Sequence, residues 1–243
     1  MRVRDRVLLV VALVVAAACV RLGLWQLERL SERRAWNSLV LSGLSRPPVS
    51  LDSLRGDVPE NRYRRTIVNG AYDADHELVL ANRPRRGSPG VHILTPLRKT
   101  GNDTAVLVLR GWVYAPDATH AELDRWREDS ARAHAGYVQE FDASSAEGPV
   151  VLEGRILRRL SYDAAASTVP YPLERYLVVL TDGTDSAAGL PPRLESPSLG
   201  EGNHMSYAFQ WFGFAAIAVA GTLVFLRHSR RAGAAQIDRF EPR

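Results

Sequence analysis

Two uncharged apolar segments lie near the ends of the chain and frame a longer region where short apolar runs alternate with polar positions. Residues 7–20 contain no charged side chain, and after Arg21 the apolar pattern resumes as far as Leu27. Residues 207–226 are twenty uncharged positions, close to the roughly 20 residues that cross about 30 Å of hydrocarbon. The pattern therefore predicts two transmembrane helices, over 7–27 and 207–226.

The first apolar segment has an alternative interpretation. Arg2, Arg4 and Arg6 in front of a short apolar run are also typical of a signal peptide, and the "AAAC" stretch that ends at Cys19 resembles a lipoprotein cleavage site. The apolar pattern nevertheless continues beyond Cys19, and Arg21 can extend its guanidinium group to the outer membrane interface. We therefore favour a transmembrane helix.

Arginines close to the two spans predict the orientation, because cytoplasmic flanks carry an excess of basic residues. Three arginines precede the first span, and Arg227, Arg230 and Arg231 follow the second. The predicted layout is a cytoplasmic N-terminus (1–6), a span (7–27), an extracytoplasmic domain (28–206), a span (207–226) and a cytoplasmic tail (227–243). No transit sequence precedes the first span, so we expect a multi-pass protein of a bacterial plasma membrane. The lipid bilayer is then the expected partner of the two spans.

The region between the spans consists mainly of short apolar runs bounded by turn residues, which predict strands. The connections between the first four runs are too short for crossover helices and favour antiparallel pairing. The predicted fold class is thus membrane α+β: two transmembrane helices flanking a mainly antiparallel β domain, a small barrel or sandwich. The predicted strands lie within residues 63–73, 77–82, 90–97, 104–114, 150–160 and 175–181.

Two segments of this region do not read as strands. Residues 119–137 combine a possible N-cap at Thr119 with Glu122 three residues later, and their apolar side chains are Leu123 and Trp126, so we predict one surface helix. Residues 189–204 are rich in proline and glycine and predict an irregular tether to the second span.

Composition and the absence of known motifs argue against several classes of function. The net charge of +4 comes with no arginine-rich stripe interleaved with aromatic residues, so we expect no nucleic-acid partner. Cys19 is the only cysteine and there are two methionines, which argues against copper delivery. The phosphate-binding, zinc-protease and nucleophile-elbow motifs of common enzymes are absent from the sequence, and we expect no enzymatic activity.

Arginines beside strands and turns have two interpretations. Arg83 and Arg85 lie in "NRPRRG" (82–87), and Arg110 and Trp112 lie in "LRGW" (109–112). Solvated turn arginines beside a half-buried Trp112 are the simpler interpretation. Recognition of an anionic group or an acidic partner surface is the alternative.

Helical periodicity divides each span into faces. In the second span, one stripe of polar and aromatic residues faces away from a stripe of small residues, and the first span has a small stripe of its own. We expect the small stripes to meet, since small residues let membrane helices approach closely. The aromatic stripe is His204, Tyr207, Trp211 and Phe214; the small stripes are Gly213, Ala216 and Ala220 in the second span and Ala12, Ala16, Cys19 and Gly23 in the first.

The outer end of the first span places Trp25 and Arg29 one helical turn apart, which favours a cation–π contact between them. Anchoring of the spans at headgroup level by an aromatic belt is the simpler interpretation of Trp25, Tyr207 and Trp211. A histidine at the mouth of a span is harder to explain as an anchor.

Five stretches occur in a particular order along the chain: "LGLWQLERL" (22–30), "YRRTIVNGAYD" (63–73), "LANRPRRGSPGVHILTPL" (80–97), "VLRGWV" (108–113) and "GNHMSYAFQWFGFA" (202–215). In this order they resemble the surfeit locus protein 1 family of cytochrome c oxidase assembly factors. The family pattern is a first span ending L-G-x-W-Q-x-x-R, an N-R…G…T-P-L block, R-G-W, and a second span beginning near H-x-x-Y-A. One departure is Leu109, where the family usually has asparagine.

The resemblance implies a non-enzymatic factor that acts when haem a enters the oxidase catalytic subunit, with haem A synthase as a further partner. It also implies that His204 ligates the haem iron. Tyr207 and Trp211 would then flank the ring, and Trp25 and Arg29 would complete the pocket from the first span. An imidazole is a good axial ligand for haem iron.

The alternative is an interaction scaffold, which holds an oxidase subunit during assembly without binding haem. In that case His204 serves as a hydrogen-bonding residue of the interface. Arg83, Arg110 and Trp112 are the candidate partner-binding residues of the outer domain.

Overall fold

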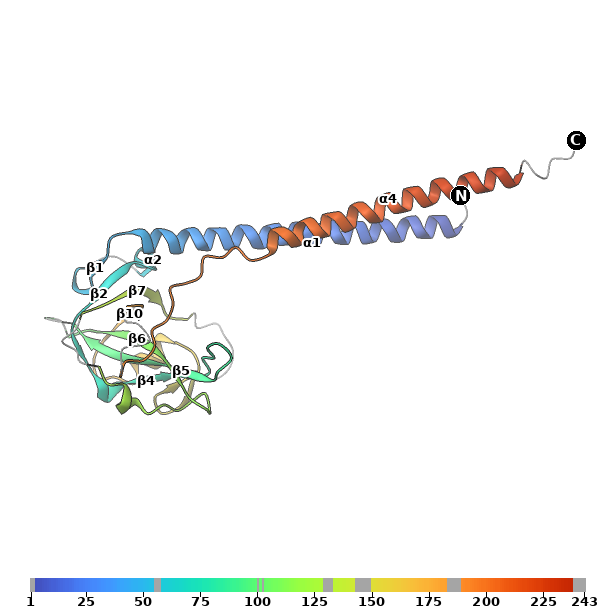
Figure 1. Cartoon of the computed structure of the whole chain (residues 1–243). Coiled ribbons are helices and arrows are strands. Elements are labelled where there is room, and N and C mark those ends of the chain that lie inside the picture. Colours follow the sequence, from blue (N-terminus) through green and yellow to red (C-terminus); the bar gives the residue numbers. More distant parts are fainter. Residues whose placement is uncertain are drawn as a thin grey trace, which may run out of the picture. The chain divides into compact units, whose positions relative to one another are not determined.

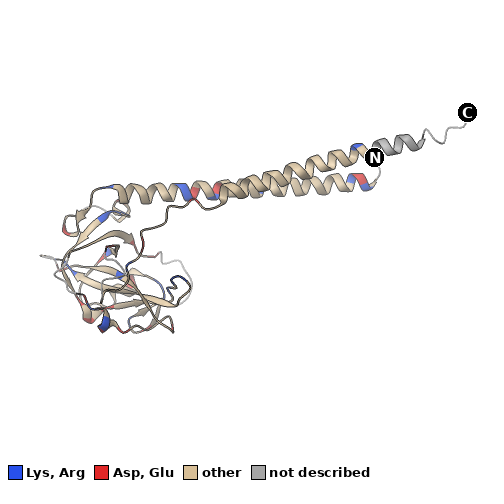
Figure 2. Ribbon diagram, viewed as in Figure 1, with Lys and Arg blue, Asp and Glu red and all other residues tan. Residues whose placement is uncertain are grey.

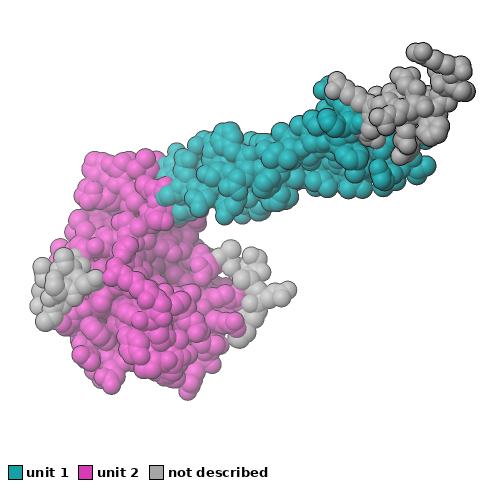
Figure 3. All heavy atoms as spheres, turned by 45° about the vertical axis from the view of Figure 1, so that its right-hand side comes forward, with its two compact units in different colours: residues 1–38, 200–243 teal, residues 39–199 magenta. Residues whose placement is uncertain are grey.

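The computed structural model describes residues 3–54, 58–99, 101, 103–128, 133–142, 150–182 and 189–237, with side chains as far as residue 228. The chain divides into two compact units (Figure 3). The first consists of residues 1–38 and 200–243, and the second of residues 39–199.

Two long helices carry the apolar segments (Figure 1). Helix α1 is Val3–Ser45 and helix α4 is His204–Ile237. Two stretches, Val3–Ser45 and His204–His228, are long and apolar enough to cross a membrane. In Figure 2, apart from Arg21, the charged residues of α1 lie before residue 7 and after residue 27. Helix α1 continues without interruption through Cys19 and eighteen residues beyond Leu27, where the predicted span ends.

The two helices pair antiparallel within the first unit. Going along α4, His204 contacts Gln26, Phe212 lies beside Gly23, and Ala215 packs on Ala16, so the numbering rises on one helix as it falls on the other. The end of α4 that follows the apolar stretch therefore lies at the same end of the pair as the start of α1. The predicted segment boundaries stay predictions, and residues 238–243 of the predicted tail lie outside the described chain.

The contact face of α1 matches the predicted stripe, whereas that of α4 does not. Ala12, Ala16, Cys19 and Gly23 are buried or half-buried. On α4 the predicted Gly213 is half-buried, but the predicted Ala216 and Ala220 are exposed. The buried or half-buried positions of α4 include Ala208, Trp211, Phe212, Ala215, Ala218, Thr222 and Leu226. The reason is that Gly23 has no side chain, because a Cβ there would lie 2.6 Å from the Phe212 ring. The glycine thus receives an aromatic side chain instead of a second small residue.

This contact predicts a specific cross-link. In a chain whose Cys19 is replaced by alanine, cysteines introduced by Ala16→Cys and Ala215→Cys should form a disulfide under mild oxidation, because these positions share one buried cluster. The matched pair Ala16→Cys and Ala216→Cys should stay largely reduced, since Ala216 is exposed. Mobility on non-reducing gels measures both. Preferential cross-linking of the second pair would contradict this helix contact.

In its described residues, the second unit contains a ten-stranded mixed sheet. Neighbouring strands follow the order β1-β2-β7-β10-β6-β5-β4-β9-β8, and β3 pairs with β5. The pairs β1–β2, β6–β10 and β4–β9 are parallel and the other six are antiparallel, so the mainly antiparallel prediction is confirmed. A barrel or sandwich stays a prediction. The strands are β1 Val49–Ser50, β2 Arg65–Val68, β3 Ala71–Tyr72, β4 Leu78–Leu80, β5 Gly90–Arg98, β6 Ala105–Tyr114, β7 His134–Glu140, β8 Val151–Glu153, β9 Ile156–Leu157 and β10 Leu173–Leu180.

The long strands β5 and β6 are buried on both faces, which explains their near-continuous apolar sequences. Their ladder is interrupted at one position: Ile93 pairs with Gly111 and Leu94 with Leu109. Arg110 is therefore the extra residue of a β-bulge, a feature that redirects a side chain.

The surface helix predicted over residues 119–137 is wrong in the described residues. The 3-10 helix η3 covers only Leu123–Trp126, and β7 already begins at His134. Leu123 and Trp126 pack against the apolar cluster around Val91 and Ile93, and this tertiary contact overrides the local helical pattern. The other short helices are α2 Val58–Asn61, α3 Tyr162–Ala166, η1 Leu51–Ser53 and η2 Ala74–His76.

Candidate functional site at the start of α4

His204 is the first residue of α4, which begins three residues before the predicted span. The chain turns into the helix at Gly202, whose φ of 72° favours glycine. The carbonyl of Asn203 then accepts a hydrogen bond from the Tyr207 amide at 3.0 Å. His204 is half-buried at this helix start.

Two arginines of α1 hold the segment that leads into His204. Arg33 Nε donates to the Gly200 carbonyl at 2.8 Å. Arg34 binds both carboxylate oxygens of Glu201 at 2.9 Å, a bidentate geometry that fixes orientation. Segments 167 residues apart in sequence are thereby joined.

Gln26 of α1 is the side chain that contacts His204 directly. The distance between His204 Nδ1 and Gln26 Oε1 is 2.9 Å. Gln26 belongs to the quoted "LGLWQLERL" motif, so the motif at the end of the first span meets the motif at the start of the second. No pattern in the sequence indicated that this glutamine contacts His204.

The predicted aromatic stripe is divided in the structure. Tyr207 and Phe214 are about half exposed, at 48% and 52%. Trp211 instead packs on the cluster of Ala16, Cys19 and Ala215, with its ring edge-to-face to Phe214 at 5.8 Å. Tyr207 and Phe214 therefore remain on the surface, whereas Trp211 belongs to the helix contact.

Trp25 and Arg29 do not stack as predicted. Trp25 is 44% exposed, and Arg29 Nη1 pairs with Glu32 at 2.7 Å, one turn further along α1. The cation–π contact at this end of α1 joins Arg33 and Trp36 at 4.3 Å. A carboxylate within reach competes successfully with the indole ring, because it offers the guanidinium a full opposite charge.

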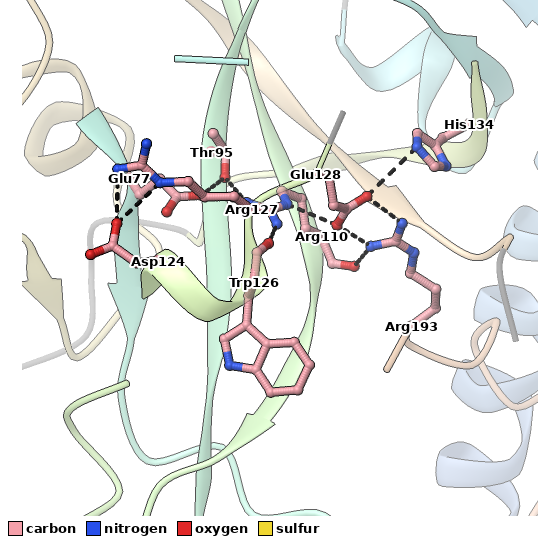
Figure 4. A network of polar contacts seen from close by, with 9 residues as sticks. All are labelled: Glu77, Thr95, Arg110, Asp124, Trp126, Arg127, Glu128, His134 and Arg193. Carbon is pink, nitrogen blue, oxygen red and sulfur yellow. Dashed lines mark hydrogen bonds and ion pairs between the residues drawn. The ribbon is translucent and has the colours of Figure 1, made fainter. Parts of the chain in front are cut away.

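In the second unit, Arg110 lies in a buried ionic network (Figure 4). Its side chain is 2% exposed and pairs with Glu77 and Glu128, which are 3% and 1% exposed. Glu128 also binds Arg193 at 2.6 Å and lies 3.6 Å from His134. Arg110 is thus neither a solvated turn arginine nor accessible to a partner at the surface.

The two glutamates of this network differ in protonation behaviour. Burial raises the pKa of Glu77 above its ordinary value, despite contacts with Thr95 and Arg110. Burial acts in the same direction on Glu128, but its bonds with Arg193 and Arg110 outweigh burial and hold the pKa of Glu128 below its ordinary value. Glu128 is therefore the fixed negative charge between the two arginines.

The whole R-G-W motif binds the tether that follows the sheet. The Trp112 amide donates to the Pro192 carbonyl at 2.9 Å, and a Cβ on Gly111 would lie 2.6 Å from that same oxygen. Arg193 Nη1 donates to the Arg110 carbonyl at 2.6 Å. The motif thus fastens residues 192–193 to β6. The sequence gives no spacing signal for Glu77, Glu128 or Arg193, because they come from three distant segments.

Trp112 lines a cavity of about 400 Å³, whereas the Arg83 guanidinium donates to the Arg158 carbonyl at 3.2 Å. Trp112 Nε1 donates to the Arg83 carbonyl at 2.5 Å, and the Arg85 guanidinium lies 5.9 Å from the centre of the Trp112 ring. The cavity is lined by Pro84, Arg85, Arg86, His92, Trp112, Leu194 and Glu195.

His92 predicts a pH-dependent stability. Burial, together with Arg83 and Arg85, lowers the pKa of His92 to about 4. Between about pH 6.5, the ordinary value, and pH 4 the unfolded chain binds a proton that the folded chain does not, so stability should fall with falling pH. His92→Gln should make the denaturation midpoint fall less steeply over this range. Equal slopes for the wild-type protein and His92→Gln would contradict the assignment.

Among the described residues, no group of three or more histidine, cysteine, aspartate or glutamate side chains is placed to hold a metal ion. A haem iron, in contrast, needs from the protein only one or two axial ligands.

Comparison with known proteins places these features in a family. The chain is 24% identical to a SURF1-like protein of Rickettsia felis over 227 residues, which covers 90% of this chain and 96% of the relative. It is 27% identical to an uncharacterized SURF1-like protein of Mycobacterium tuberculosis over 204 residues, covering 81% and 73% of the two chains. A SURF1-like protein of Monosiga brevicollis is 25% identical over 234 residues, covering 85% and 82%.

The model of the SURF1 family matches residues 13–216. This range includes the end of the first span, the sheet, the tether and the start of the second span. The chain therefore belongs to the SURF1 family, whose members are assembly factors of cytochrome oxidase.

Proposed function

We propose that this protein binds haem a through His204 and presents it during insertion into the catalytic subunit of cytochrome c oxidase. The observation that carries the proposal is the hydrogen bond between His204 Nδ1 and Gln26. A histidine that ligates a metal through one ring nitrogen commonly donates a hydrogen bond from the other. His204 has this arrangement at the start of α4, within the residues that the family model matches.

The residues around His204 fit a porphyrin. Tyr207 and Phe214 offer exposed aromatic surface on the same helix, which suits an apolar macrocycle. Arg21 and Arg29 are exposed, and they pair with Glu28 and Glu32 of the same helix. Such surface pairs are worth about 0–1 kcal/mol, so either guanidinium group can turn to a propionate. When bound, the haem supplies an iron that accepts the imidazole as axial ligand.

The helix pair supports a membrane location for this site. Phe209 and Ile217 of α4 are 70% and 69% exposed, and Val10 and Val14 of α1 are 58% and 63% exposed. Apolar surface of this extent is typical of lipid contact. With both termini in the cytoplasm of a bacterial cell, His204 lies at the outer interface of the plasma membrane. The catalytic subunit and haem A synthase are the expected partners there.

Purification from cells that make haem A tests this function. We expect the wild-type protein to retain haem a in near-stoichiometric amount, measured by pyridine haemochrome, together with the oxidase catalytic subunit. The same preparation from cells without haem A controls for adventitious colour. A protein that retains the subunit but never haem would contradict the proposal.

A scaffold without haem is the second candidate, and the cavity beside Trp112 favours it. Arg85 and Arg86 line this cavity with Trp112, and arginine with tryptophan is a frequent combination at protein interfaces. Of the predicted partner-binding residues, Trp112 lines this cavity. The guanidinium of Arg83 instead binds the Arg158 carbonyl, and Arg110 belongs to the buried ionic network. If this surface binds the oxidase subunit, Arg86→Glu should reduce its co-purification without changing the haem content.

A further inference from the structure

The bond between Gln26 and His204 determines which ring nitrogen carries the proton. An amide oxygen can only accept a hydrogen bond, so His204 Nδ1 must donate to Gln26 Oε1. In the neutral ring the lone pair then lies on Nε2. Of the two possible tautomers, this is the one in which Nε2 can ligate a metal.

The other edge of the ring is kept open by Gly202. A Cβ on Gly202 would lie 3.5 Å from His204 Nε2 and 3.4 Å from Cδ2. The backbone at Gly202 also has a φ of 72°, which disfavours any other residue. The glycine thus leaves space beside the nitrogen that bears the lone pair.

Gln26 is itself held in place. It is half-buried on the contact face of α1, between Gly23 and the buried Leu30. About two turns further along α1, Arg33 binds the backbone of Gly200 and Arg34 binds the side chain of Glu201. The two arginines therefore hold the backbone that leads into His204, and Gln26 holds its imidazole ring.

We infer that Gln26 is a positioning residue that selects the Nδ1–H tautomer of His204 and moderates its strength as an iron ligand. The inference rests on the proposed function. Hydrogen-bond partners of a ligating histidine tune its basicity, and a neutral amide does so less than a carboxylate. An amide therefore orients the ring while leaving the bond to iron weak enough for transfer to another protein.

Three variants separate these effects. Gln26→Met keeps the length of the side chain and removes the acceptor, Gln26→Glu replaces the neutral acceptor with a charged one, and Gln210→Met makes the same change at an exposed site on α4. We expect haem to leave Gln26→Met about 10- to 100-fold faster than wild type, since such partners typically contribute that factor. Haem should leave Gln26→Glu more slowly than wild type, and Gln210→Met should match wild type. Transfer to apomyoglobin, followed optically, measures these rates.

The tautomer is measured without haem. Nitrogen-15 spectra of the solubilised full chain, labelled in its histidine rings, distinguish a protonated from an unprotonated ring nitrogen, and His204→Ala identifies the signals. At a pH where imidazole is neutral, wild type and Gln26→Glu should show Nδ1 protonated, and Gln26→Met a mixture of tautomers.

The possible results separate the two proposals. An Nε2–H tautomer in wild type, or a tautomer unchanged in Gln26→Met, would overturn the inference. A changed tautomer with an unchanged rate of haem release would overturn the positioning role. The expected tautomers in a protein that never binds haem would overturn the proposed function instead.

Discussion

Replacing Glu128 with leucine is expected to lower the free energy of unfolding of the β domain by about 3–5 kcal/mol. Glu128 is 1% exposed and is the carboxylate shared by Arg110 and Arg193, at 3.0 Å and 2.6 Å. Its removal leaves Arg193 without this carboxylate, and it leaves Arg110 with Glu77 as its remaining described ion-pair partner. The pKa of Glu77 is already raised by burial. The desolvation of two guanidinium groups is then poorly compensated.

The measurement is urea denaturation of the detergent-solubilised chain, followed by tryptophan fluorescence. Asp124→Leu is the matched control, because Asp124 is 89% exposed and pairs with Arg127 at 2.8 Å on the surface. That variant should lose about 1 kcal/mol or less. A similar loss for the two variants would mean that the buried network does not stabilise the domain.

The second large effect concerns the oxidase. In cells that depend on this protein, His204→Ala should lower the haem a content of the oxidase several-fold, because alanine offers no ligand to iron. The measurement is the amount of haem a and of oxidase subunits in membranes that contain equal amounts of the wild-type protein or of His204→Ala. The fold should survive, since His204 is only half-buried and the arginine contacts of residues 200–201 do not involve its side chain.

His228→Ala is the matched control on the same helix, at an exposed position far from the start of α4. It should leave the haem content unchanged. If His204→Ala supports full oxidase assembly, the protein acts as a scaffold and the arginines beside Trp112 become the residues to test.

The helices and strands follow from local patterns, whereas the contacts that build the site do not. Apolar runs were sufficient to predict β4, β5, β6 and β10, because each strand is a nearly continuous apolar run between turn or polar residues. The helix predicted around Trp126 does not form, because the apolar side chains of this segment pack against sheet residues that are distant in sequence. A periodicity over nineteen positions cannot contain that information.

The face of α4 that contacts α1 was predicted from residue size alone, and the prediction was wrong for Ala216 and Ala220. Ala216 and Ala220 look like a contact stripe, but the bulky Phe212 packs at Gly23 and turns Ala215 toward α1. Likewise His204 was recognisable from its unusual place, but Gln26 is an ordinary residue at the end of a span. Its role depends on a partner 178 residues away.

The most direct test of haem binding through His204 is the optical spectrum of the reduced protein, purified from cells that make haem A, beside that of His204→Ala. The account predicts a Soret band and an a-type band in the wild-type protein, both lost in the variant at equal protein yield. Equal bands in the two proteins would contradict His204 as the ligand, and no band in either would contradict haem binding altogether.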